Sequence, residues 1–138
     1  MPIKPVIQQE ATGCAIASTA VLAGVSYAAA KKVANNMAIS ANDASLWSDT
    51  AHIRRLLQAY HIKADNTEIP FKSWQALPDR ALLAIKWHME KGTPYWHWVV
   101  FVRDVSWEYV LDSKKALKKN VRMDFGRIKP KWFIGVTT

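Results

Sequence analysis

The spacing of hydrophobic and polar positions changes near residue 80. Before it, apolar residues recur every three or four positions, as in helices, and after it they form runs rich in β-branched and aromatic residues, as in strands. The pattern predicts helices over 12–23, 26–36 and 49–60, and strands over 81–87, 96–103, 107–112 and 131–137. Because the helices come first and the antiparallel strands follow, we expect an α+β domain in two layers.

Small polar residues mark the expected helix starts. Thr12 is positioned to cap the first helix, Ser26 the second, and Ser48 or Asp49 the third. The run from 15 to 23 in the first helix is small or apolar on nearly every face, which predicts a helix enclosed by protein on all sides.

The connections follow from turn-forming residues. We expect loops over 40–45 and 88–94, and one short helical turn near 73–76. A tight turn at 103–106, with Asp104 and Val105 as a two-residue loop, would pair Arg103 with Ser106 and place His97 directly opposite Asp112. A slip of one residue would move Asp112 to the other face of the sheet.

Length and composition favour one globular domain over residues 1–138. Of these 138 residues, 50% are hydrophobic, which is enough for a substantial core. A single cysteine excludes an internal disulfide, and the sequence has no Cys/His spacing of a zinc site, so we expect no metal or cofactor. Apolar runs stay shorter than the roughly 20 residues of a membrane helix. These features favour a chain that works in a reducing cytoplasm.

Positive charge is the most distinctive feature of the composition. The formal net charge is +8, and from Arg103 to the end nine Lys or Arg stand against four acidic residues. Such a surplus favours acidic partners, which include an acidic peptide, nucleic acid and a membrane surface. The same charge also serves solubility alone, and the sequence leaves both interpretations open.

The first predicted helix carries the only cysteine, Cys14, in its first turn. Free N–H groups and the positive end of the helix dipole stabilise a thiolate there, and the thiolate is the reactive form of cysteine. A lone cysteine is also common as an inert packing residue, so the interpretation depends on partners elsewhere in the chain. Gln8 is placed to point its amide, together with the Cys14 backbone N–H, at one oxyanion; Gln9 is the second candidate.

The predicted sheet supplies a base and an acid for this cysteine. His97 lies in one strand and Asp112 ends the next, so the carboxylate is placed to hold one imidazole nitrogen and fix the tautomer that serves Cys14. His88 is the rival base. Trp96 and Trp98 flank His97 and are expected to face the core.

The order of Gln8, Cys14, the run 97–100 (HWVV) and the run 111–113 (LDS) resembles the papain-like peptidase domain that trims double-glycine leaders from bacteriocin and peptide precursors. In that family a glutamine six residues before the cysteine helps form the oxyanion hole, a histidine opens a strand, and an aspartate closes the next. The chain departs from the family at the neighbours of the cysteine, where Gly13 and Ala15 stand in place of Asp and Gly.

This resemblance implies a papain-like fold and a free-standing relative of the exporter peptidases, without their membrane and nucleotide-binding domains. It implies a thiol peptidase that acts on peptides, in which Cys14 attacks, His97 moves the proton and Asp112 orients His97. Gln8 would stabilise the oxyanion. Two alternatives remain: acyl transfer or glutamine deamidation by the same side chains, and a non-catalytic binding module whose basic surface holds an acidic peptide or nucleic acid.

Overall fold

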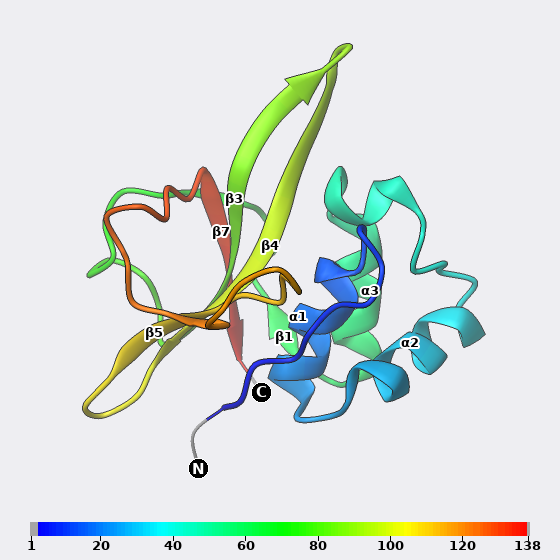
Figure 1. Cartoon of the computed structure of the whole chain (residues 1–138), viewed down its shortest axis with the longest axis horizontal. Coiled ribbons are helices and arrows are strands. Elements are labelled where there is room, and N and C mark those ends of the chain that lie inside the picture. Colours follow the sequence, from blue (N-terminus) through cyan, green and yellow to red (C-terminus); the bar gives the residue numbers. More distant parts are fainter. Residues whose placement is uncertain (1–2, 138) are drawn as a thin grey trace.

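The protein is described by a computed structural model over residues 3–137, in which helices pack against one face of an antiparallel sheet (Figure 1). The helical half contains α1 (Cys14–Ala23), α2 (Tyr27–Asn36), the 3₁₀ helix η1 (Ala44–Trp47) and α3 (Ala51–Ala59). The strands are β1 (Lys63–Ala64), β2 (Ile69–Pro70), β3 (Arg80–Glu90), β4 (Thr93–Arg103), β5 (Glu108–Leu111), β6 (Val121–Arg122) and β7 (Trp132–Thr137). The two-layer α+β architecture expected from the sequence is confirmed.

The sheet is antiparallel throughout and has the order β1-β7-β3-β4-β5-β6, with β2 also paired to β7. The long hairpin of β3 and β4 extends past the helices in Figure 1. The last strand therefore lies inside the sheet, between β1 and β3, because its partners come from the middle of the chain.

Both faces of the central strands are buried, as their continuous apolar runs predict. Alternate residues of β3 and β4, such as Leu82 and Trp98, join the helices in one core, while Leu83 and Phe101 join a second core under the loops on the other face. Helix α1 lies against β4 and is buried from Cys14 to Leu22, which confirms the expectation of an enclosed helix.

The predicted hairpin register between β4 and β5 is wrong by two residues. Arg103 pairs with Glu108 and not with Ser106, and the turn is a four-residue loop in which the Asp104 N–H donates to the Trp107 carbonyl at 2.8 Å. The loop is longer because Asp-Val lacks the glycine or asparagine that favours the positive φ angles of a two-residue hairpin. A two-residue shift preserves the alternation of faces, so the expected side for Asp112 is retained.

The hairpin between β3 and β4 and the start of α1 also differ from prediction. Residues 88–94 form a loop only at Lys91 and Gly92, whose φ angles of 50° and 83° suit a two-residue turn. The Thr12 hydroxyl donates to the Ala41 carbonyl and does not cap α1, whose N-cap is Gly13. The predicted cap of α2 is confirmed, since the Ser26 side chain accepts from the Ala29 N–H at 3.1 Å.

The third helix starts one or two residues later than predicted. Its N-cap is Thr50, although the Asp49 carboxylate accepts the Ala51 N–H at 2.6 Å. The end of the expected loop over 40–45 forms the start of η1. The strands β1, β2 and β6 were not predicted, because two residues are too few to show an alternation of apolar and polar positions.

Candidate functional site

Cys14 is the first residue of α1, so its side chain lies at the helix end where N–H groups are free. The Sγ atom accepts the backbone N–H of Trp98 in β4 at 3.5 Å, and the residue has 0% of its surface exposed. Gly13 permits close packing beside it, because a Cβ atom at that position would lie 2.3 Å from the Tyr27 hydroxyl. The sulfur is therefore fixed between the start of α1 and the middle of β4.

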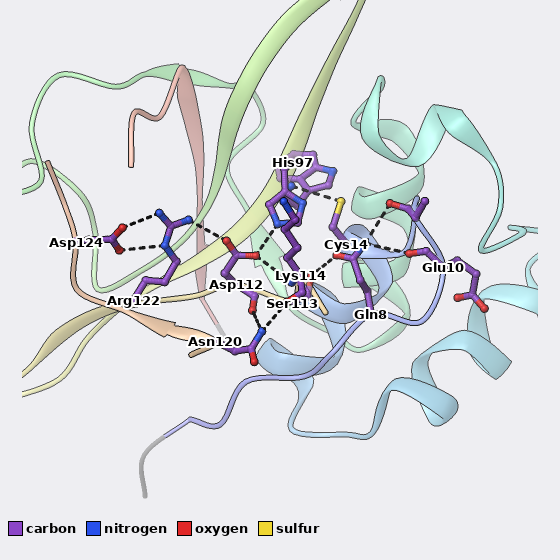
Figure 2. A network of polar contacts seen from close by, with 12 residues as sticks. Gln8, Glu10, Cys14, His97, Asp112, Ser113, Lys114, Asn120, Arg122 and Asp124 are labelled. Atoms are coloured by element: carbon purple, nitrogen blue, oxygen red, sulfur yellow. Dashed lines mark hydrogen bonds and ion pairs between the residues drawn. The ribbon is translucent and has the colours of Figure 1, made fainter. Parts of the chain in front are cut away.

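His97 and Asp112 are joined by a direct contact. The Nε2 atom of His97 lies 2.7 Å from Oδ1 of Asp112 (Figure 2), and the two side chains are 12% and 0% exposed. Cys14 lies beside the same imidazole, since its Sγ accepts the backbone N–H of the next residue, Trp98, and its charge raises the pKa of His97. The three residues therefore meet although 98 positions separate Cys14 from Asp112. The structure thus brings together the cysteine, histidine and aspartate that the sequence singled out.

Asp112 is held by further donors. Its Oδ2 accepts Nη1 of Arg122 at 3.0 Å, and its Oδ1 also accepts the Lys114 N–H at 3.0 Å. Arg122 is itself fixed by Asp124, which accepts from its Nε at 3.0 Å and its Nη2 at 2.9 Å. This network, drawn in Figure 2, leaves the carboxylate little freedom to rotate away from His97.

The network separates the pKa values of the two central residues. Burial lowers the pKa of His97, but the hydrogen bonds and negative charges of Asp112 and Cys14 outweigh it and raise the pKa to about 9. Burial raises the pKa of Asp112, but His97, the Lys114 N–H and Arg122 outweigh it and lower the pKa to about 2. Both groups are thus charged at neutral pH.

Gln8 lies beside this group and is 9% exposed. Its Nε2 donates to the carbonyls of Glu10 and Ala11 at 3.0 and 3.1 Å, and its Oε1 accepts the Ser113 hydroxyl at 2.7 Å. The Gln8 N–H also donates to the Ser113 carbonyl at 3.0 Å, which ties the segment before α1 to the residue after Asp112. Both hydrogens of the Gln8 side-chain amide therefore already donate to carbonyls. One of these two hydrogen bonds must break before the amide can donate to an oxyanion.

The two rival residues, His88 and Gln9, are both exposed. His88 is 53% exposed in its side chain, its Nδ1 lies 2.9 Å from the Lys86 carbonyl, and its Nε2 lies 3.4 Å from Glu90. Gln9 is exposed. Both line the groove described next, while the contact with Cys14 belongs to His97.

A groove with a volume of about 800 Å³ opens beside His97. Its walls are Gln8 to Ala11, the aromatic side chains of Trp47, Tyr95 and Trp96, and three lysines, Lys86, Lys114 and Lys115. Glu10, in one wall of the groove, is held against α2, because its carboxylate accepts the Tyr27 hydroxyl and pairs with Lys31 at 2.5 Å. Trp96 and Trp98, at 5% and 0% exposure, confirm the prediction that they belong to the core.

The sequence did not identify Arg122 or Lys86 as members of the site. Arg122 lies in β6, a strand of two residues that the sequence pattern does not reveal, and Lys86 lies at a β-bulge that changes the register between Ile85 and His88. The sequence does show basic residues after Asp112. There are several of them, so the sequence could not indicate which one contacts the carboxylate.

Residues 3–137 contain no group of three or more His, Cys, Asp or Glu side chains that could hold a metal ion. In the same residues no single helix is long and apolar enough to cross a membrane, although α1 and α2, bent by 112° at their junction, meet the length and composition criterion as a pair.

Comparisons with known proteins support the fold. The chain is similar to the crystal structure of a double glycine motif protease from an AMS/PCAT transporter in complex with the leader peptide, with a TM-score of 0.59 and 16% identity. The match covers 98% of this chain and 91% of that chain. No family model and no curated protein matches the sequence. The papain-like fold that the resemblance implies is therefore confirmed.

Proposed function

We propose that the protein is a cysteine peptidase or peptidase-like hydrolase that cleaves peptide substrates. The observation that carries the proposal is the 2.7 Å contact between His97 and Asp112, made by an imidazole that lies beside Cys14. A thiol, a base and an orienting acid in this order are what acyl transfer through cysteine requires.

In the proposed reaction His97 holds the proton of the Cys14 thiol, and the thiolate attacks the substrate carbonyl to form an S–C bond. The C–N bond then breaks, and His97 delivers the proton to the departing amine. Water, deprotonated by His97, attacks the thioester, which releases the acid and restores the thiol. Asp112 keeps the imidazole oriented throughout, and the Cys14 N–H and the Gln8 amide donate to the oxyanion.

The substrate class follows from the groove and from the structural neighbour. That protease is described with its leader peptide bound, which supports a peptide in the groove of this chain. The lysines at the groove favour a peptide with acidic residues over a neutral one. Acyl transfer and glutamine deamidation use the same side chains and differ only in the acceptor or the bond attacked.

A non-catalytic binding module is the second candidate, and the complete burial of Cys14 favours it. Turnover requires access to the sulfur from the groove, and Cys14 is not among the residues that line the groove. A binding module makes no such demand, because peptide contacts with the groove walls suffice.

A thiol-directed activity-based probe distinguishes the two candidates. Wild type, His97→Ala and the matched control His88→Ala would be labelled between pH 5 and 10, and the labelled residue identified by mass spectrometry. The peptidase proposal expects rapid labelling of Cys14 in wild type and His88→Ala, and a loss of at least about 100-fold in His97→Ala. Labelling only after denaturation would reject the peptidase and favour the binding module.

A further inference from the structure

Two lysine ammonium groups lie together in the groove beside His97. Lys86 comes from β3 and Lys114 from the loop after β5, and both line the groove with Lys115. Burial and the neighbouring positive charge of Lys114 lower the pKa of Lys86. Like charges gathered at one groove repel each other, so this arrangement favours a bound anion.

The backbone holds both lysines in place. Lys86 has a φ angle of 54°, an unfavourable value for a residue with a long side chain, and it lies where β3 bulges relative to β4. Lys114 is fixed by its N–H bond to Asp112 and by its carbonyl, which accepts Asn120 Nδ2 at 3.0 Å. Strained backbone of this kind concentrates at functional sites.

The acidic side chains around the groove are already paired. Glu10 pairs with Lys31, Glu90 with His88, and Asp112 with His97 and Arg122. Among residues 3–137, none of Lys86, Lys114 and Lys115 forms an ion pair with a carboxylate. The groove therefore carries positive charge that the chain itself does not neutralise.

We infer that Lys86 and Lys114 form a subsite that binds a carboxylate of the peptide substrate next to His97, with Lys115 at its rim. The inference rests on the proposed function and adds a location and two residues to it. Two lysines carry six N–H donors, enough to fill the roughly four lone-pair sites of one carboxylate, and each bond is charge-assisted. The carboxylate comes either from an Asp or Glu side chain or from the C-terminus of the peptide.

Fluorescence anisotropy on the Cys14→Ala protein, which cannot turn over substrate, tests the subsite. Three labelled octapeptides of alanine and glycine would be compared: one with a central glutamate and an amidated C-terminus, one with glutamine and an amide, and one with glutamine and a free carboxylate. We expect an anionic peptide to bind about tenfold more tightly than the neutral one. The anionic peptide that gains affinity identifies the source of the carboxylate.

The advantage of the anionic peptide should disappear in Lys86→Gln and Lys114→Gln and persist in Lys86→Arg. Lys118→Gln is the matched control, because it removes one charge from the same loop but does not line the groove. Equal loss in Lys118→Gln, or persistence in both groove variants, would overturn the subsite. Binding of single-stranded DNA or RNA that depends on both lysines, without peptide discrimination, would instead assign the pair to nucleic acid.

The two proposals fail separately. Peptide discrimination with an unreactive Cys14 would reject the peptidase and keep the carboxylate subsite. Probe labelling without discrimination would keep the peptidase and reject the subsite.

Discussion

The Nε2 atom of His97 lies 2.7 Å from Oδ1 of Asp112, although the two residues are not opposite each other in the sheet. The paired part of β4 and β5 ends at Val100 and Leu111, so both side chains lie beyond the ladder. The contact is instead maintained by the turn after β5, where the Asp112 N–H donates to the Asn120 carbonyl at 2.8 Å and Asn120 Nδ2 donates back to the Asp112 carbonyl at 2.7 Å.

The first prediction concerns stability at alkaline pH. The pKa of His97 is raised from 6.5 to about 9, so its contribution is fully present below pH 6.5 and is lost as the pH rises through 9. We expect urea unfolding to show a decrease of about 3 kcal/mol in the free energy of unfolding between pH 6 and 10. Titration of the His97 ring by NMR gives the pKa directly.

His88→Ala is the control for this pH dependence, since His88 is exposed and pairs with Glu90 and not with Asp112. It should retain the alkaline loss of the wild type. A His97 ring that titrates below pH 7 in the folded protein would contradict the prediction.

The second prediction concerns Asp112→Asn. The pKa of Asp112 is lowered from 3.8 to about 2, so its contribution is present above pH 3.8 and is lost as the pH falls through 2. At pH 7 the variant should lose about 3 kcal/mol of stability, because a buried ion pair is broken. It should also lower the pKa of His97 and slow labelling of Cys14.

Asp124→Asn is the comparison for that variant, because Asp124 contacts Arg122 without touching His97. Its effect on the pKa of His97 should be small. Equal pKa changes in the two variants would contradict a specific role for Asp112.

The third prediction concerns Gly13→Ala. The new Cβ would collide with the Tyr27 hydroxyl, which anchors Glu10, so either the Tyr27 side chain or the start of α1 must shift. We expect a loss of about 1–3 kcal/mol in the free energy of unfolding, measured by denaturant, together with slower labelling of Cys14. Gly126→Ala, with nothing within 4 Å of its added Cβ, should leave both measurements near wild type.

The fourth prediction separates Gln8 from Gln9 as the oxyanion donor. Gln8→Ala should reduce kcat for peptide cleavage by about 100-fold, because one donor to the oxyanion is removed. Alkylation of Cys14 by iodoacetamide, which forms no oxyanion, should change little, and Gln9→Ala should be near wild type in both assays. An equal loss of alkylation and cleavage in Gln8→Ala would show that the amide only supports the loop.

The fold class and the three residues Cys14, His97 and Asp112 could be predicted from the amino-acid sequence alone. Continuous apolar runs in β3 and β4 predicted strands buried on both faces, and the small apolar run after Cys14 predicted an enclosed helix. These signals are local, because burial on every side requires apolar residues at every position. The Ser26 cap was readable for the same reason, since its partner lies three residues away.

The contacts between these residues could be seen only in the tertiary structure. The pairing of Asp112 with His97 depends on a four-residue loop and on Asn120, and the support of Asp112 comes from Arg122 in a strand too short to predict. Lys86 reaches the groove through a β-bulge, whose extra residue leaves no mark on hydrophobic spacing. Such contacts join distant parts of the chain and depend on loop length and register, which apolar periodicity does not encode.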